Sequence, residues 1–226
     1  PKINIRSFDW RYHNDPYAIL VSEFMLQQTQ TQRVIAKFAE WMHRFPNLQS
    51  VASASLTEIL QVWVGLGYNR RAQNLYRTCQ ILAQHNVNVP TKKEDLLNLP
   101  GIGAGTAGAI LVYAYNLPEI FLETNIRTVF IHHFFKEATT PIPDRVLYPL
   151  IQKHLDYSDP RTWYYKIVDY GVLLKKEIGN LNKLSSTYSK QSKFVGSNRQ
   201  KRSLLLKSIL KNGYVYMDSE NQSIIF

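Results

Sequence analysis

The chain has 226 residues, 45% of them hydrophobic, so it can fold around a sizeable core and is not a disordered polypeptide. Its 27 Lys and Arg residues against 17 Asp and Glu give a net charge of +10, which favours an anionic partner such as nucleic acid or an acidic membrane. The single cysteine, Cys79, excludes an internal disulfide and a cysteine-rich metal cluster built from these residues.

The sequence predicts a soluble protein of the cytoplasm. No stretch approaches the roughly 20 uninterrupted apolar residues of a membrane span. The first residues, PKINIRSFDWRYHNDPY, lack the apolar core of a signal peptide.

The segment 15–45 predicts two helices joined by a short break. Asp15 and Pro16 form the usual start signal of a helix. Apolar residues then recur at helical spacing on both sides of a polar interruption at 27–32. The next short helix has Ser55 as its cap with Glu58 three residues on, the capping-box pattern, and ends at the glycines of 65–67.

Helical patterns continue through most of the chain. They are expected at 70–86, 92–100, 125–135, 144–155 and 160–179. Because no strong period-two segment occurs before residue 213, the sequence predicts an all-α fold. From 179 to 202 the composition becomes basic and loop-rich; a last helix over 202–212 and a small two-stranded hairpin over 213–226 follow.

The stretch NLPGIGAGTAGAIL, 98–111, predicts a helix, a tight turn and a second helix. Pro100 ends the first helix, and Gly101 and Gly103 can take positive φ and bring bare backbone to the surface. The N–H groups at the start of the next helix would then be free to meet a phosphate. The alternative is a plain helix-helix turn with a close packing contact.

Three stretches together resemble DNA base-excision glycosylases. The pattern L-P-G-I-G-x-x-T-A resembles their helix-hairpin-helix element. The segments WRYHNDPYAILVSEFMLQQTQTQRV and WVGLGYNRRAQNL resemble adenine glycosylases of the MutY type, cousins of endonuclease III, and the similarity runs from Phe8 to Leu174.

That resemblance implies two helical lobes with the active site in the cleft between them. One lobe, over 18–117, is a six-helix barrel that includes the helix-hairpin-helix. The other combines 1–17 with 118–178, and 179–226 forms a basic C-terminal extension. In the family, the hairpin grips the phosphate backbone without reading sequence and binds a monovalent cation through carbonyls, here expected at Gly101–Gly103. No other metal is expected.

The resemblance also implies a pair of catalytic carboxylates. Glu23 matches the family's general acid for the purine, and its apolar neighbours would raise its pKa; the alternative is an ordinary exposed or capping glutamate. Glu123 stands where the family carries the aspartate of L-D-G-N-V. Thr124 replaces the glycine and Asn125 is kept. Glutamate reaches about 1.5 Å further than aspartate, so the backbone compensates, the substrate differs or the activity is weak.

The remaining expected site residues would handle DNA. Gly105 occupies the position of the nucleophilic lysine of bifunctional relatives, so a water-using hydrolase without lyase activity is expected. Glutamine side chains would fill the gap left by the flipped base, and Tyr68 would wedge into the stack. The full expected DNA-binding set is Gln27, Gln28, Gln30, Tyr68, Arg70, Arg71, Gly101, Gly103, Gly105, Thr106 and Asn125.

The chain departs from the family in two places. Most relatives carry a four-cysteine iron–sulfur cluster after the segment that here reads VDYGVLLKKEIG, and this chain has no cysteine there, so no cofactor is expected. The basic stretch with Tyr188 and Phe194 would contact DNA by charge instead, or would be a solvated linker. The 226 residues also leave no room for the family's further domain that inspects 8-oxoguanine, which weakens the choice of substrate.

The sequence therefore favours a monomeric, cytoplasmic, nucleoid-associated DNA glycosylase that acts on double-stranded DNA. Adenine opposite 8-oxoguanine or guanine is the first candidate, while uracil or thymine in G mismatches, or a damaged purine, stays open. The alternative is a non-catalytic DNA-binding module, supported by Glu123 in place of aspartate. A membrane-surface protein has only the charge in its favour.

Overall fold

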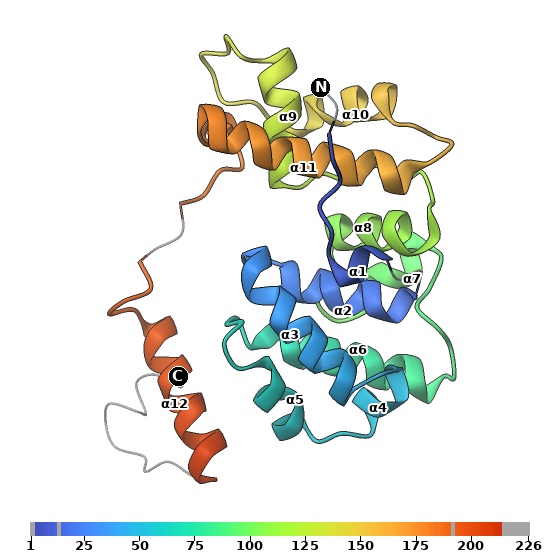
Figure 1. Ribbon diagram of the computed structural model, residues 1–226, viewed down its shortest axis with the longest axis vertical. Helices are drawn as coiled ribbons and strands as arrows, with labels where there is room; N and C mark the ends of the chain where they lie inside the picture. Colours follow the sequence, from blue (N-terminus) through green and yellow to red (C-terminus); the bar gives the residue numbers. More distant parts are fainter. Residues whose placement is uncertain (1–2, 13–14, 191–192, 214–226) are drawn as a thin grey trace. The chain divides into compact units, whose positions relative to one another are not determined.

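The computed structural model describes residues 3–12, 15–190 and 193–213, which form an all-helical fold (Figure 1). The described part contains no β-strand, only an isolated bridge between Ile142 and Ser185. The all-α prediction is confirmed, whereas the hairpin predicted over 213–226 lies outside the described residues. The elements are α1 (Asp9–Tyr12), α2 (Pro16–Leu26), α3 (Thr31–Arg44), α4 (Leu48–Ala52), α5 (Leu56–Trp63), α6 (Arg70–Gln84), α7 (Lys93–Leu97), α8 (Ala104–Tyr115), α9 (Thr124–Phe134), η1 (Asp144–Val146), α10 (Tyr148–His154), α11 (Pro160–Ile178), η2 (Leu181–Leu184) and α12 (Asn198–Asn212).

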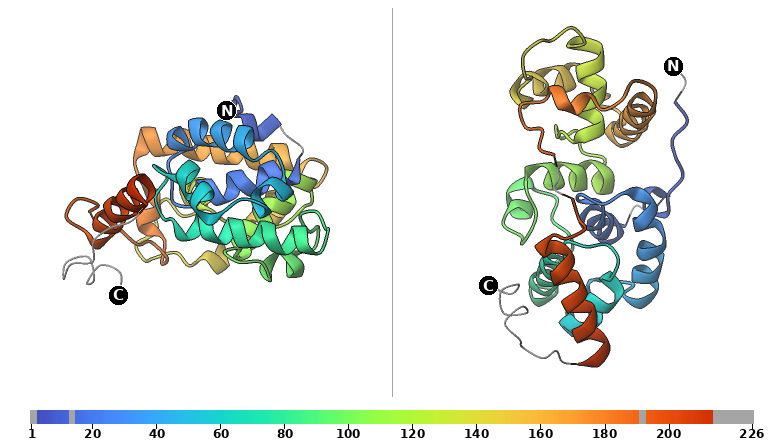
Figure 2. Two further views of the ribbon diagram at one scale, coloured as in Figure 1. Left: turned by 90° about the horizontal axis from the view of Figure 1, so that it is seen from below. Right: turned by 90° about the vertical axis from the view of Figure 1, so that its left-hand side faces the viewer.

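The chain forms two compact units. Unit 1 comprises Pro1–Phe24 and His85–Ser189, and unit 2 comprises Met25–Gln84 and Lys190–Phe226. Within unit 1, α9 packs against α11 (Figures 1 and 2). Within unit 2, α4 and α5 pack on α6, and α12 contacts α5. The lobe boundaries predicted from the sequence stay a prediction.

The predicted break between the first two long helices is confirmed, since α2 ends at Leu26 and α3 begins at Thr31. Asp15 accepts a hydrogen bond from the Tyr17 amide at 3.0 Å, which secures the start of α2. The capping box of α5 is also present: the Glu58 amide donates to the Ser55 hydroxyl at 3.2 Å, and the Glu58 carboxylate accepts from the Ser55 amide at 2.9 Å. These local signals set the helix boundaries as the sequence indicated.

The last helix is longer than predicted. It begins at Asn198 instead of Arg202, because Ser197 supplies an N-cap and accepts a hydrogen bond from the Gln200 amide at 3.3 Å. The basic connection before it also contains the short η2 turn.

Two glycines in unit 1 allow close approaches, one between α8 and the segment before α9 and one between α11 and α9. A Cβ atom at Gly108 would lie 2.6 Å from Cβ of Phe121, and one at Gly171 would overlap the backbone carbonyl of Asn125. Gly171 therefore allows α11 to touch the first turn of α9. Any larger side chain at this position must displace that turn, because the neighbouring atoms are backbone.

A buried ion cluster ties the N-terminal segment to α11. Asp169 is 2% exposed and accepts from the Arg6 amide and Nε, both at 2.6 Å, and from Arg11 Nη1 and Nη2 at 2.7 and 3.0 Å. Burial alone would raise the pKa of Asp169, but the hydrogen bonds from Arg11 and Arg6 hold it below its usual value. Arg11 also lies 4.4 Å from the centre of the Tyr165 ring, a cation-π contact.

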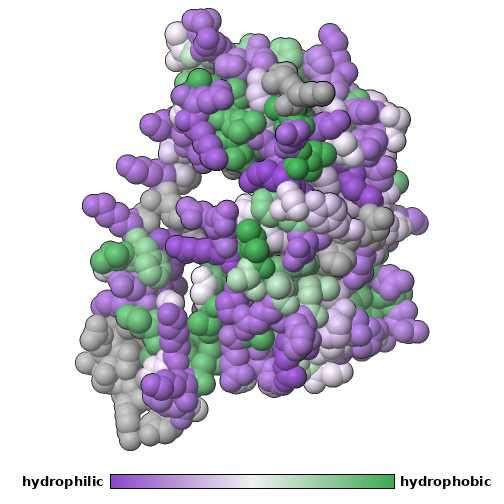
Figure 3. Space-filling view, viewed as in Figure 1, coloured by the Kyte–Doolittle hydropathy of each residue, from purple (hydrophilic) through white to green (hydrophobic). Residues whose placement is uncertain are grey.

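None of the helices in the described ranges is both long and apolar enough to cross a bilayer. The face of the molecule shown in Figure 3 is largely hydrophilic, with small hydrophobic patches between the hydrophilic residues.

Removing the Asp169 carboxylate should be strongly destabilising. We expect Asp169→Ala to lower the free energy of unfolding by about 3–5 kcal/mol, because Arg11 is left buried without its counter-charge. The lowered pKa of Asp169 means that this stabilisation is present at neutral pH and is lost as the pH falls through the folded-state value. Urea unfolding at pH 7 and in acid measures both effects.

The matched control is Glu40→Gln, which removes an exposed carboxylate paired with Lys37 at 2.7 Å. Such i,i+3 surface pairs contribute roughly 0.5 kcal/mol or less. Equal losses in the two variants would contradict the role assigned to Asp169.

Candidate active site and nucleic-acid interface

Two glutamates in unit 1 interact electrostatically. Glu23 lies on α2 between the buried side chains of Val21 and Phe24, and its own side chain is partly exposed. Burial raises the pKa of Glu23 to about 8, the negative charge of Glu123 adds to this, and the positive charge of Arg11 opposes it. Glu23 therefore carries a proton near neutral pH, as a general acid must.

Glu123 lies at the N-cap of α9. Its carboxylate accepts hydrogen bonds from the Ile126 amide and from Asn125 Nδ2, both at 3.3 Å. Burial raises the pKa of Glu123, whereas these donors and the Arg127 guanidinium oppose the rise. A helix N-terminus also favours negative charge. The structure thus places Asn125 as the residue that orients Glu123.

Three residues near the carboxyl groups had no role in the sequence prediction. Arg11 contributes its charge to the pKa of Glu23, and the buried Tyr113 of α8 stacks on Tyr165 with ring centres 4.6 Å apart. Burial and then the charge of Glu23 are the main causes that raise the pKa of Tyr113 well above its usual value. Arg11 stands in the WRYHNDPY segment, but its partner Asp169 is 158 positions away. No local pattern announces a pairing over that distance.

The glycine turn between α7 and α8 lies open at the surface. Gly101 has φ +78°, as predicted, but Gly103 has φ −97° and is the N-cap of α8, so it does not adopt the positive φ expected. Gly101, Gly103 and Gly105 are exposed, while Ile102 is buried and anchors the turn. The N-terminus of α8, with Thr106 in its first turn, is therefore covered by almost no side chain.

In unit 2, the turn that carries Tyr68 lies beside the loop of glutamines. Gln28 and Tyr68 both have positive φ, at 54° and 49°. The Arg71 guanidinium joins the two segments: it donates to the carbonyls of Met25 and Gly67 at 2.8 and 3.0 Å. That Gln27, Gln28, Gln30 and Tyr68 act together on DNA stays a prediction.

Arg71 itself does not fit the phosphate contact predicted for it. It is 7% exposed, and besides these two carbonyls it donates to the carbonyl of Leu66 at 3.3 Å and to the Thr29 hydroxyl at 2.8 Å. Burial lowers the pKa of Arg71 to about 10, which still leaves it charged at neutral pH. Arg71 supports the two loops from inside, whereas Arg70, at the start of α6, is exposed.

No cluster of three or more His, Cys, Asp or Glu side chains able to hold a metal occurs in the part of the chain that the structure describes. Cys79 is buried in α6, and burial raises its pKa to about 12. The absence of an iron–sulfur cluster and the cation site at Gly101–Gly103 stay predictions.

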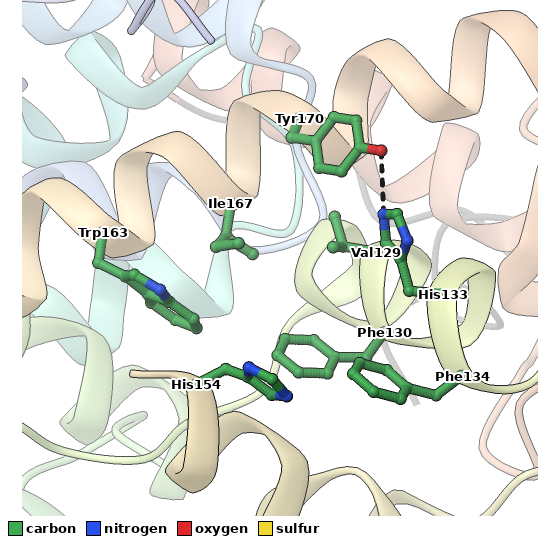
Figure 4. Close-up of a pocket in the computed structure, with 8 residues that line it drawn as sticks. All are labelled: Val129, Phe130, His133, Phe134, His154, Trp163, Ile167 and Tyr170. Atoms are coloured by element: carbon green, nitrogen blue, oxygen red, sulfur yellow. Dashed lines mark hydrogen bonds between the residues drawn. The ribbon is translucent and has the colours of Figure 1, made fainter. Parts of the chain in front are cut away.

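A separate pocket of about 520 Å³ lies at the other end of α9 from Glu123 (Figure 4). The His133 ring accepts or donates a 2.9 Å hydrogen bond with the Tyr170 hydroxyl at its edge, and burial together with His132 lowers the pKa of His133. None of the predicted site residues lines it. Its lining comprises Val129, Phe130, His133, Phe134, His154, Trp163, Ile167 and Tyr170.

A family model described as "HhH-GPD superfamily base excision DNA repair protein" matches residues 21–147. The chain belongs to the HhH-GPD superfamily. The matched range contains Glu23, Tyr68, the glycine turn and Glu123, whereas Arg11, Asp169 and α12 lie outside it.

Curated relatives extend the HhH-GPD match. The adenine DNA glycosylase of Buchnera aphidicola subsp. Baizongia pistaciae is 34% identical over 170 residues, which cover 75% of this chain and 48% of that protein. The adenine DNA glycosylase of Mycobacterium tuberculosis strain H37Rv is 42% identical over 126 residues, covering 55% and 41%. The chain thus spans about half the length of the curated relatives it matches.

Two solved structures have the same fold as this chain. A thermostable thymine-DNA glycosylase superposes with a TM-score of 0.65 at 21% identity and covers 81% of this chain and 88% of its own. An endonuclease III–DNA complex gives 0.61 at 19% identity, covering 71% and 75%. These likenesses confirm the predicted fold class.

The raised pKa of Glu23 predicts an unusual pH dependence of stability. The folded protein holds the Glu23 proton more tightly than the unfolded chain, so stability should fall as pH rises from the ordinary value of 4.5 to about 8. In Glu23→Gln, we expect the free energy of unfolding to fall by roughly 2–4 kcal/mol less over this pH range than in wild type. Urea unfolding at pH 5 and pH 8.5 measures it, with the exposed Glu137→Gln as control. Identical pH profiles for wild type and Glu23→Gln would refute the assignment.

The close approach at Gly171 predicts a structural requirement behind the site. Gly171→Ala should lower the free energy of unfolding by about 1–3 kcal/mol, as overpacking does. Because the added methyl group meets Asn125, it should also shift the amide resonance of Ile126, which bonds to Glu123. Gly105→Ala, whose Cβ would meet only Leu122 O at 3.9 Å, is the control for an ordinary glycine substitution. If Gly171→Ala changed neither the free energy of unfolding nor the Ile126 amide resonance, α9 would not depend on this contact.

Proposed function

We propose that the chain is a monofunctional DNA glycosylase that hydrolyses the N-glycosidic bond of a flipped base. The observation that carries this proposal is the interacting pair of Glu23, whose pKa is raised to about 8, and Glu123, which is held by backbone and side-chain N–H groups. Such a cleavage needs two carboxyl groups: one donates a proton, and the carboxylate of the other stabilises positive charge.

The chemistry follows from those two environments. The target base must leave the stack before a side chain can reach it. Glu23 donates its proton to a ring nitrogen of the base, which lets the base leave with the electron pair of the glycosidic bond. The Glu123 carboxylate stabilises the oxocarbenium-like sugar until water adds to it. Gly105 provides no amine at the position of the lysine nucleophile, so we expect no Schiff-base lyase step.

DNA binding is assigned to the two exposed segments described above. The bare N-terminus of α8 suits a phosphate, since helix N–H groups and the helix dipole both favour an anion. In unit 2, the Tyr68 turn and the glutamine loop would enter the duplex around the extruded base. We propose double-stranded DNA as the partner, a monomeric enzyme without a cofactor, and a place near the nucleoid in the cytoplasm.

Adenine opposite 8-oxoguanine or guanine is the proposed substrate. The curated relatives are named adenine DNA glycosylases, from bacteria and from mammals such as Rattus norvegicus. Other bases, such as uracil or thymine opposite guanine, are the alternative, because Glu123 is one methylene longer than the family's aspartate. A DNA-binding module without catalysis is the second candidate, since the Glu123 carboxylate already caps α9.

Single-turnover assays on duplexes separate these functions. With A:8-oxoG, A:G, U:G, T:G and hypoxanthine substrates, we expect adenine release to be fastest. Glu123→Gln should abolish release and leave duplex affinity within about threefold, because the change removes charge at the sugar and little contact area. Glu137→Gln, an exposed glutamate on unit 1, is the control. If the protein bound the duplexes but released no base from any of them, the glycosylase proposal would be wrong and the non-catalytic DNA-binding module would be supported.

A further inference from the structure

Tyr68 is held by an arginine from the last described helix. Arg199 Nη1 donates to the Tyr68 hydroxyl at 2.7 Å, and its guanidinium carbon lies 5.5 Å from the centre of the Tyr68 ring. The same guanidinium lies 5.4 Å from the Phe194 ring. All three residues belong to unit 2. Arg199 thus bridges two aromatic side chains that are 126 positions apart in the sequence, 68 against 194.

The backbone beneath Tyr68 is fixed by other groups. The Gly67 carbonyl accepts from Trp63 Nε1 at 3.1 Å and from Arg71 at 3.0 Å. Tyr68 itself has φ +49°, a conformation that non-glycine residues adopt only where the surroundings impose it. Several contacts therefore fix the backbone of the turn. The Arg71 guanidinium lies 5.5 Å from the centre of the Tyr68 ring, and Arg199 adds the hydrogen bond to the Tyr68 hydroxyl.

The helix that supplies Arg199 is strongly basic. Its sequence, NRQKRSLLLKSILKN, has five basic residues and no acidic residue: Arg199, Lys201, Arg202, Lys207 and Lys211. None of its residues is fully buried, and the four basic residues after Arg199 are exposed. A helix with this charge lowers its own electrostatic energy when a polyanion lies along it.

We propose that α12 is a second phosphate-binding element and that Arg199 is a positioning residue, which fixes the Tyr68 side chain for entry into the duplex. This inference rests on the proposed function, since it takes double-stranded DNA as the partner. Arg199 lies outside the family match, and the residue that it positions, Tyr68, lies inside the match. The charge of α12 then supplies affinity that does not depend on sequence, while Arg199 couples it to the Tyr68 turn.

A double-mutant cycle on the full chain tests the coupling. The variants are Arg199→Ala, Tyr68→Phe and their combination, with Arg145→Ala, an exposed arginine of unit 1, as the control for loss of one charge. The readouts are duplex affinity and the fluorescence of 2-aminopurine placed next to the target, which reports unstacking. We expect each single variant to lose roughly tenfold in affinity and to reduce the fluorescence rise. The double variant should bind the duplex no more weakly than the single variant with the lower affinity.

Salt dependence tests the charge of α12 separately. Lys201→Ala and Lys207→Ala together should reduce the slope of log K against log salt by about 2, because each phosphate contact contributes about 1. Additive losses from Arg199→Ala and Tyr68→Phe, or an unchanged salt slope, would overturn the inference while wild type still binds and cleaves. If wild type binds no duplex at all, the proposed function fails first and the inference fails with it.

Discussion

The structure depends on one constraint: a carboxyl group set among buried apolar side chains keeps its proton. Glu23 sits on α2, a helix whose residues 18–21 are almost completely buried, so its charged form has little water to stabilise it. Burial is the largest cause of its pKa near 8, ahead of the charge on Glu123.

The second carboxyl group has different partners. Burial also raises the pKa of Glu123, but the first turn of α9 supplies N–H donors that oppose the rise, and Gly171 lets α11 support that turn from behind. Arg11 belongs to the surroundings of Glu23. It contributes positive charge near Glu23 and is itself fixed by the buried Asp169 on α11. The same helix, α11, thus holds both the backbone at Glu123 and the cation near Glu23, although no residue of α11 carries out the proposed chemistry.

Local signals made much of this predictable from the sequence. Asp15 with Pro16, the capping box at Ser55 and Glu58, and the glycine turn each depend on residues within a few positions, so the sequence alone indicates where those helices begin. Glu23 and Glu123 were found through resemblance to a family. The sequence could not reveal Arg11 with Asp169 or Gly171 with Asn125, because these contacts join distant segments. The phosphate contact predicted for Arg71 does not fit the structure for a related reason: whether an arginine is buried depends on the loops around it.

The most direct test measures whether the Glu23 carboxyl group is protonated at neutral pH. The carboxyl carbon of Glu23, followed by 13C NMR in protein labelled at glutamate and assigned with Glu23→Gln, reports its protonation directly. This resonance should titrate near pH 8, far above the ordinary glutamate pKa of 4.5. A midpoint near 4.5 would show that Glu23 is ionised at neutral pH, and the division of labour between the two carboxyl groups would then be wrong.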